Sequence, residues 1–198
     1  VVPWRMALAE KARTQLESES LPAFVAAQRW YAAKGAALTR MTLLDHVEWS
    51  ARGGNWLIGV FRAESEAREA HTYFLPLTLV WEDGEDDRKR NVLPTAVAKV
   101  RQQARIGIMG DALGDEAFCR AVVAAIGSGE ELRCARGIIR FVPTGAFKQI
   151  AGDNLEALPV RFSGAQSSNT TVAIGVRMFL KAYRRLQVGV NPEAEIGR

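Results

Sequence analysis

The sequence predicts an α+β fold, in which blocks of antiparallel strands alternate with helices. Residues 4–18 are rich in helix-forming side chains, and from residue 41 the apolar residues recur with the period of two that a strand requires. A second helical pattern follows Asp115. Because short turns join the strands, we expect antiparallel sheets covered by helices rather than a doubly wound parallel sheet.

Composition predicts a globular chain that buries a sizeable core. The 198 residues are 48% hydrophobic, and 26 Lys and Arg against 22 Asp and Glu give a formal net charge of +4. The basic residues are scattered, so no nucleic-acid surface is indicated. Two isolated cysteines, Cys119 and Cys134, predict a reducing, cytoplasmic location and no disulfide framework. His46 and His71 stand alone and are predicted as half-buried strand residues rather than zinc ligands.

The two ends of the sequence indicate a piece of a longer protein. The chain begins with Val1 instead of Met and stops shortly after residues 191–193 open what reads as a helix. The natural protein is therefore expected to continue past Arg198. No apolar window approaches the length that a membrane span needs, and residues 1–4 lack the features of a signal peptide.

The first half of the chain is predicted to hold two helices and three strands. Ser20 is expected to cap a short second helix that continues to Trp30. A strand follows, with a turn at residues 52–55 leading into its hairpin partner. The apolar residues expected on one face of that first strand are Met41, Leu43, Val47 and Trp49, and those on one face of the third strand are His71, Tyr73, Leu75, Leu77 and Leu79.

Residues 82–90 form an acidic and then basic run, interpreted as a solvated hairpin tip or linker. A cation or phosphate site is the less favoured alternative. Strands are expected at residues 96–100 and 104–109, followed by a helix that Asp115 caps and Gly127 ends. The remaining pattern predicts strand structure at 132–142, a short helix capped by Thr144, and three further strands from residue 159 onward.

One constellation near the C-terminus suggests chemistry. Residues 163–171 form a small, hydroxyl-rich loop between two strands, whose backbone N–H and hydroxyl groups could converge on phosphate oxygens. Lys181 then interrupts an apolar strand, on the side of Phe179 and Tyr183. Kinase-like folds hold nucleotide phosphates with such a lysine and orient it with a helical glutamate. The alternatives are an ordinary connecting turn and a lysine that extends to solvent from an edge strand.

Two long motifs resemble bacterial maltokinases and the maltokinase-like region fused to some trehalose synthases. Residues 21–35 resemble the family's opening motif, and residues 180–198 resemble its lysine-containing strand and the helix start that follows. Residues 111–115 and 140–144 are weaker anchors between them. The resemblance implies a cap subdomain of helices and antiparallel strands at residues 1–92. An intermediate subdomain and a protein-kinase-like N-lobe sheet would follow at 93–198, truncated at the start of the next helix.

The resemblance also implies an activity and a set of binding residues. The family transfers the γ-phosphoryl group of ATP, with Mg²⁺, to maltose and yields maltose 1-phosphate for trehalose and α-glucan metabolism. The nucleotide-binding residues carried over by position are Ser168, Asn169, Thr170, Lys181 and Glu195, with Glu193 as the alternative partner of Lys181. Gln166 and Ser167 stand where the family commonly has Glu-Gln.

The resemblance leaves the catalytic aspartate, the magnesium ligands and the acceptor site outside these residues, because kinase-like folds supply them from a second lobe. We therefore expect no catalytic residue, no resident metal and no phosphoryl transfer from this chain alone. The alternative function is a noncatalytic interaction module that binds a trehalose synthase domain. Its candidate aromatic anchors are Trp30, Trp49, Trp56 and Trp81, although core packing is the more common use of tryptophan.

Overall fold

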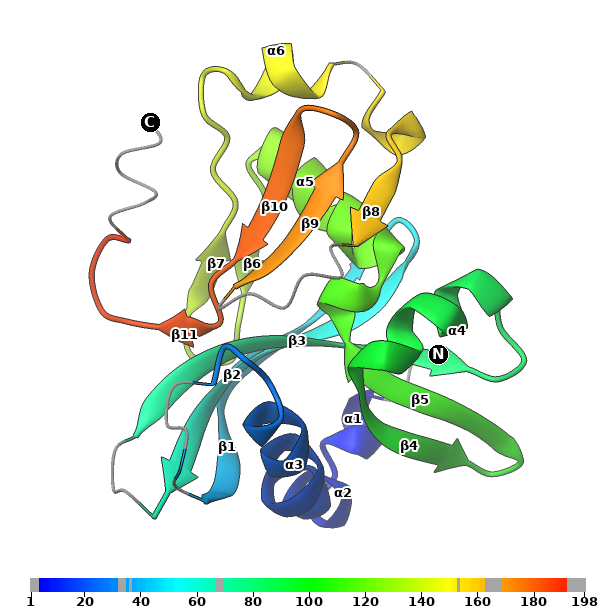
Figure 1. Cartoon of the computed structure of the whole chain (residues 1–198), viewed down its shortest axis with the longest axis vertical. Coiled ribbons are helices and arrows are strands. Elements are labelled where there is room, and N and C mark those ends of the chain that lie inside the picture. Colours follow the sequence, from blue (N-terminus) through cyan, green and yellow to red (C-terminus); the bar gives the residue numbers. More distant parts are fainter. Residues whose placement is uncertain are drawn as a thin grey trace.

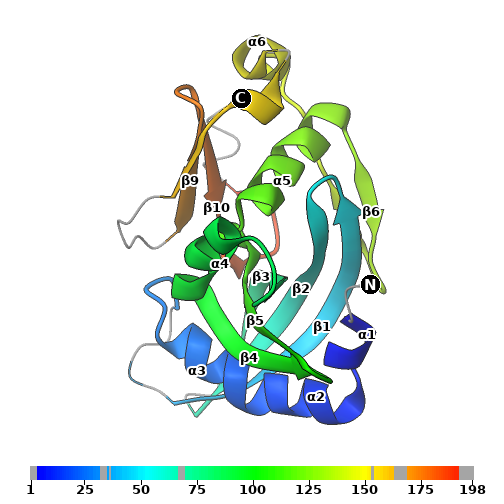
Figure 2. The same ribbon diagram turned by 90° about the vertical axis from the view of Figure 1, so that its right-hand side faces the viewer.

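The computed structural model describes residues 4–31, 35, 37–66, 70–152, 154–162 and 169–191. It is an α+β structure with antiparallel sheets, as predicted. Figure 1 shows a large sheet in the lower half of the molecule, with the N-terminal helices beneath it and a small sheet above. In Figure 2 helix α5 lies between the two sheets. The molecule therefore has two apolar layers, one on each face of the large sheet.

The large sheet has the strand order β1-β2-β3-β5-β4, with β11 also paired to β3. Its strands are β1 (Leu38–Ala51), β2 (Gly54–Ser65), β3 (His71–Trp81), β4 (Ala96–Gln102), β5 (Arg105–Asp111) and β11 (Arg185–Leu186). The β5 partner covers β3 from Leu77 to Trp81, whereas β11 covers only Thr72 and Tyr73. The sheet thus extends across the predicted domain boundary between residues 92 and 93, which stays a prediction.

The hairpin predicted at residues 52–55 is confirmed. Ala51 pairs with Gly54, so Arg52 and Gly53 form the turn. Gly53 has φ +96°, a conformation that side chains with a Cβ rarely adopt, which explains the glycine at this position.

A β-bulge in β1 corrects the predicted facing of that strand. Met41 and Leu43 pair with Ala63 and Phe61, but the register shifts between Leu43 and Asp45. The extra residue reverses the alternation, because a one-residue slip moves every later side chain to the other face. Met41 and Leu43 therefore belong to the cluster under the sheet, while Trp49 belongs to the cluster on the opposite face. The expectation that all four apolar residues share one face was wrong.

The N-terminal helices run almost continuously, which corrects the predicted cap at Ser20. The segments are α1 (Trp4–Ala7), α2 (Glu10–Gln15), a π-helical turn (Leu16–Ser20) and α3 (Leu21–Ala26). Ser20 has helical dihedral angles, and its side chain caps nothing. The buried residues of these segments, including Trp4, Leu16, Leu21 and Val25, cover the lower face of the sheet.

Glu17 joins the π-helical turn to the bulge of β1. Its carboxylate accepts hydrogen bonds from the backbone N–H of Leu43 at 3.0 Å, from Arg13 at 2.8 Å and from Arg40 at 2.9 Å. Burial acts to raise the pKa of Glu17, but these three donors outweigh it and leave the pKa below its usual value. The helix and the bulge are therefore fixed by one charged contact.

The acidic and basic run at 82–90 is mostly exposed, as predicted, but it contains the start of helix α4 (Asp86–Val92) instead of a hairpin tip. Arg88 departs from the prediction, because it turns inward and binds the buried Asp115. A short 3-10 turn, Leu93–Thr95, leads from α4 into β4.

Helix α5 (Glu116–Ser128) packs on the upper face of the large sheet. Asp115 caps it, as predicted, by accepting a hydrogen bond from the N–H of Ala117. Its end lies two residues later than expected, at Gly129 in the left-handed conformation. Trp49, Trp56 and Phe118 meet in tilted and edge-to-face contacts with ring centroids 5.5–5.9 Å apart. These rings form the centre of the upper apolar cluster.

The small sheet has the order β10-β9-β8. Its strands are β8 (Val160–Phe162), β9 (Thr170–Ile174) and β10 (Met178–Ala182). The strand structure expected over 132–142 is a hairpin of β6 (Glu131–Arg133) and β7 (Ile138–Arg140). Helix α6 (Phe147–Ala151) and a 3-10 turn (Leu155–Ala157) lie between β7 and β8 in the chain. The carbonyl of Thr144, rather than its side chain, accepts the N–H of Phe147.

Replacing Glu17 by Gln should make stability less dependent on pH. A lowered folded-state pKa stabilises the fold above the unfolded-state value near 4.5, and this contribution disappears as the pH falls through the folded-state pKa. Glu17→Gln should therefore lose about 1–3 kcal/mol at pH 7 and much less near pH 3. Urea unfolding at both pH values measures this. Glu19→Gln, an exposed carboxylate two residues away, is the control, and equal losses at both pH values would contradict the assignment.

Cys119 should resist thiol reagents until the protein unfolds. Burial, together with the Asp115 and Asp111 carboxylates, strongly raises the pKa of this fully buried thiol. In native Cys134→Ser protein, Ellman's reagent at pH 8 should detect no thiol, and in urea it should detect one. A rapid reaction of native Cys134→Ser would show that the helix α5 interface opens readily.

Candidate functional site

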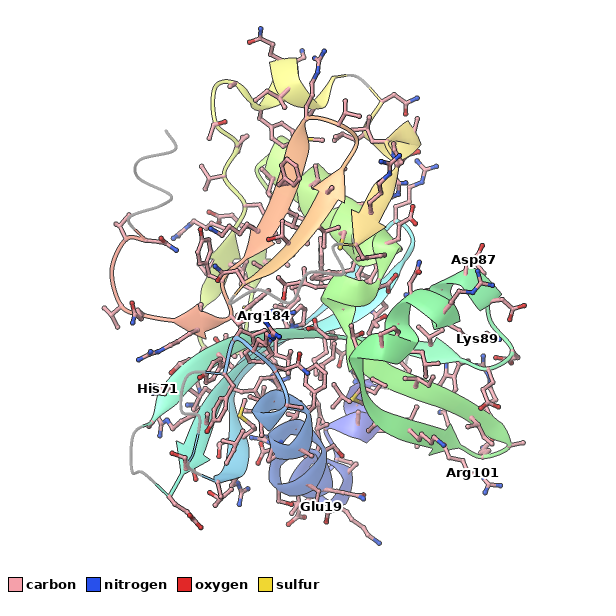
Figure 3. All side chains as sticks on the ribbon, in the orientation of Figure 1. Glu19, His71, Asp87, Lys89, Arg101 and Arg184 are labelled. Carbon is pink, nitrogen blue, oxygen red and sulfur yellow. The ribbon has the colours of Figure 1, made fainter. Side chains whose placement is uncertain are left out.

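A buried arginine, Arg184, lies where the two sheets meet, and Figure 3 shows it at the centre of the molecule. Its guanidinium forms a two-point ion pair with Asp111, in which Nη1 donates to Oδ1 at 3.2 Å and Nη2 donates to Oδ2. Nε donates to Oγ1 of Thr170 at 3.0 Å. The Arg184 and Asp111 side chains are 1% and 5% exposed, so water screens the pair little.

Strand pairing explains why Arg184 reaches this position. On one edge of β3, β5 ends at the pair of Asp111 with Leu77, and β11 begins at the pair of Arg185 with Tyr73. Arg184 fills the gap between them, and its carbonyl accepts the N–H of Phe74 at 2.7 Å. The same short edge of β3 therefore brings the end of β5 and the start of β11 together.

Asp111 and Asp115 enclose one turn of 3-10 helix, Ala112–Gly114, and both carboxylates are buried. Asp111 also accepts the N–H of Leu113 at 3.1 Å. Asp115 accepts from Trp56 Nε1 at 2.9 Å, from Thr78 Oγ1 at 2.7 Å and from Arg88 Nη2 at 2.6 Å. Each carboxylate thus has a guanidinium partner and further donors, the condition under which a buried charge is tolerated.

A cavity of about 430 Å³ adjoins the Arg184 contact. The turn after α3 contributes Gln28 and Trp30 to its wall, and α4 contributes Asn91. Thr170, the first residue of β9, and the preceding Asn169 also line it. The Trp30 ring lies 5.3 Å from the Arg184 guanidinium carbon. The N-terminal helical region and the described end of the predicted phosphate loop, Asn169 and Thr170, therefore border one cavity.

Thr170 and Lys181 lie on opposite faces of the small sheet. Lys181 pairs with Thr171, whereas Thr170 pairs with Ala182 on the face that carries the buried Val172 and Ile174. Lys181 and Phe179 lie on the outer face, where Phe179 is 71% exposed. The Nζ of Lys181 is 5.0 Å from the Tyr183 ring centroid, so these two side chains share a side.

The structure brings some of the predicted site residues together. Asn169 and Thr170 are adjacent to Arg184 and the cavity, and Lys181 lies one strand away through its pair with Thr171. The predicted residues Ser168, Glu193 and Glu195 lie outside the described residues, as do Gln166 and Ser167.

The sequence analysis missed the roles of Asp111, Arg184 and Arg88. A signal was available for Asp111, because residues 111 and 115 enclose only the small or apolar residues Ala112, Leu113 and Gly114, a composition that favours burial. Two carboxylates that close together in a buried turn need cationic partners. No local pattern identifies those partners, because Arg184 is 73 residues from Asp111 in the chain.

The buried tryptophans reduce the support for an aromatic docking surface. Trp30, Trp49 and Trp56 are at most 9% exposed, and Trp81 packs under Arg105 at 4.6 Å. Three of the four predicted anchors thus serve the core. His46 and His71 are half-buried strand residues, as predicted.

Among the described residues, no group of three or more His, Cys, Asp or Glu side chains is arranged to hold a metal ion. Asp111 and Asp115 are already bound by Arg184 and Arg88. The helices in the described part of the chain include none with the length and apolar character of a membrane span.

Breaking the Arg184–Asp111 pair on one side should destabilise the fold strongly. Asp111→Asn or Arg184→Met alone should cost about 3–5 kcal/mol, because each leaves a buried charge without its partner. The double variant Asp111→Asn/Arg184→Met should lose clearly less than the sum of the two single losses. Urea unfolding measures the cycle. Asp83→Asn, in the exposed pair with Arg105, is the control and should have a far smaller effect. Additive losses would contradict the pairing.

Comparison with protein families relates the first half of the chain to a known domain. Residues 24–115 match the family described as the maltokinase N-terminal cap domain. The matched segment begins in α3, contains β1 to β5 and ends at Asp115, the residue that caps α5. It includes Asp111 and most of the lower apolar cluster. The N-terminal region of this chain is therefore related to the cap domain of maltokinases.

Proposed function

We propose that this chain is the nucleotide-facing N-terminal part of a sugar kinase that uses ATP to convert maltose to maltose 1-phosphate. The observation that carries the proposal is the position of Lys181. It lies on the exposed face of a three-stranded antiparallel sheet and pairs with Thr171, which directly follows the predicted phosphate-loop residues Asn169 and Thr170.

This arrangement suits a triphosphate. Phosphoryl transfer depends on positioning and on neutralising the charge of the phosphate oxygens. A strand lysine supplies a fixed positive charge, and a turn between two strands supplies backbone N–H donors. Because Lys181 projects from the outer face, a phosphate group can approach it without displacing the core side of the sheet.

The proposed roles follow the order of the chain. Ser168, Asn169 and Thr170 would form the phosphate loop, and Lys181 would bind the phosphates. Glu195 would orient Lys181, with Glu193 as the alternative. ATP would supply the transferred group, and Mg²⁺ would neutralise its charge. The described residues include no group of three or more His, Cys, Asp or Glu side chains arranged for a metal ion. We assign the magnesium ligands and the catalytic aspartate to a second lobe outside these residues.

The choice of maltose is supported by the cap-domain match alone. The activity would place the protein in trehalose and α-glucan metabolism in the cytoplasm. A trehalose synthase domain remains a proposed partner. Because Trp30, Trp49 and Trp56 are buried, its contact surface would have to use other side chains.

Lys181→Ala should abolish most of the kinase activity of the natural protein that carries this sequence. Loss of a charge that stabilises the transferring phosphates should lower kcat/KM for ATP at least about 100-fold. Formation of maltose 1-phosphate from ATP, Mg²⁺ and maltose, followed by ³¹P NMR, measures this. Lys99→Ala, which removes an exposed lysine from β4 in the cap-matched region, is the control and should leave the rate unchanged.

The isolated 198-residue chain should form no maltose 1-phosphate under the same conditions. Robust turnover by this chain would show that the active site has been misplaced. Equal activity of Lys181→Ala and the parent protein would remove the basis of the nucleotide assignment.

A further inference from the structure

We infer that Arg184 is a positioning residue for the nucleotide, which acts through Thr170 to hold the phosphate-binding end of β9 against the cap-matched region. This inference rests on the proposed function, because it assigns a purpose to a contact behind the same sheet. Arg184 itself faces the core and does not reach the outer face that carries Lys181.

The first step is the orientation of the Arg184 guanidinium. Asp111 binds both Nη atoms and thereby fixes the plane of the group. Nε is then left to donate to Thr170 Oγ1 at 3.0 Å. The Trp30 ring, 5.3 Å from the guanidinium carbon, limits movement on another side. The Thr170 hydroxyl is therefore held from a preformed and almost fully buried support.

The second step is the position of Thr170 in the sheet. It is the first residue of β9, its neighbour Asn169 belongs to the predicted phosphate loop, and its neighbour Thr171 pairs with Lys181. Holding the Thr170 side chain on the inner face therefore also holds the backbone of its two neighbours, Asn169 in the loop and Thr171 opposite Lys181. Thr170 is assigned to positioning through its hydroxyl rather than to direct phosphate contact.

The third step is the origin of the support. Asp111 ends β5 inside the cap-matched segment, whereas Thr170 and Arg184 lie outside it. The contact therefore connects the cap-matched sheet to the proposed nucleotide sheet. Disturbing it should weaken nucleotide binding without touching the outer face.

A double-mutant cycle tests whether Arg184 acts through Thr170. Thr170→Val removes only the hydroxyl acceptor and keeps a β-branched strand residue. Arg184→Lys keeps the charge beside Asp111 but loses the fixed Nε donor. In the natural protein that carries this sequence, each variant should raise the Kd for ATP about 5- to 20-fold. The Kd of the double variant should not exceed the higher of the two single-variant Kd values, because both substitutions remove the same contact.

Two matched variants separate positioning from general damage. Thr170→Ser retains the hydroxyl and should restore the Kd to within about twofold of the parent value. Arg185→Lys makes the same substitution one residue later, at an exposed position, and should not change the Kd. Multiplying effects in the double variant, or an unchanged Kd in Thr170→Val, would overturn the inference while leaving the kinase proposal intact.

A ligand-free measurement keeps the inference testable if the nucleotide assignment fails. Amide hydrogen exchange of a peptide covering residues 169–174 should be faster in Thr170→Val and Arg184→Lys than in the parent and Arg185→Lys proteins. If the parent binds no ATP, the proposed function fails. Unchanged exchange in both variants would then also refute the anchoring role of Arg184.

Discussion

The ion pair between Arg184 and Asp111 is the contact on which the junction of the two sheets depends. Removing each charge from water costs several kcal/mol, so the pair holds only because its geometry and its added hydrogen bonds offset that cost. Both Nη atoms bind the carboxylate, Nε binds Thr170, and Asp111 also accepts the Leu113 N–H. Because these hydrogen bonds form only when the strands are correctly placed, the pair favours one relative placement of the strands over others.

The segment from Asp111 to Asp115 connects this ion pair to other elements of the fold. Its first carboxylate binds Arg184, which in turn donates to Thr170 at the start of β9. Its second carboxylate caps α5 and accepts from the side chain of Trp56 in β2. One tight turn therefore orients the large sheet, the small sheet and the helix between them. It lies at the end of the segment that matches the maltokinase cap domain, and so links that region to the rest of the chain.

Some features of this structure were predictable because residues close together in the sequence determine them. The alternation of apolar residues predicted the strands, the glycine-containing turn predicted the first hairpin, and Asp115 was recognised as a helix cap. The errors came from distant partners. Glu17 stabilises the bulge of β1 from 26 residues away. Arg184 and Arg88 were not recognised as partners of buried carboxylates, since no periodicity predicts which charges meet after folding. Lys181 was located on its strand, whereas its proposed glutamate partners lie outside the described residues.

Strand β2 contributes side chains to both apolar clusters. Leu57 and Phe61 of this strand enter the lower cluster, while Trp56 and Ile58 enter the upper one. A polypeptide cut near residue 92 would lose β4, β5 and α5 together. It would display an open edge of β3 and a bare aromatic surface, the combination that promotes self-association. The cap-matched strands and helix α5 therefore need each other to cover these surfaces, and this requirement holds independently of the function of either part.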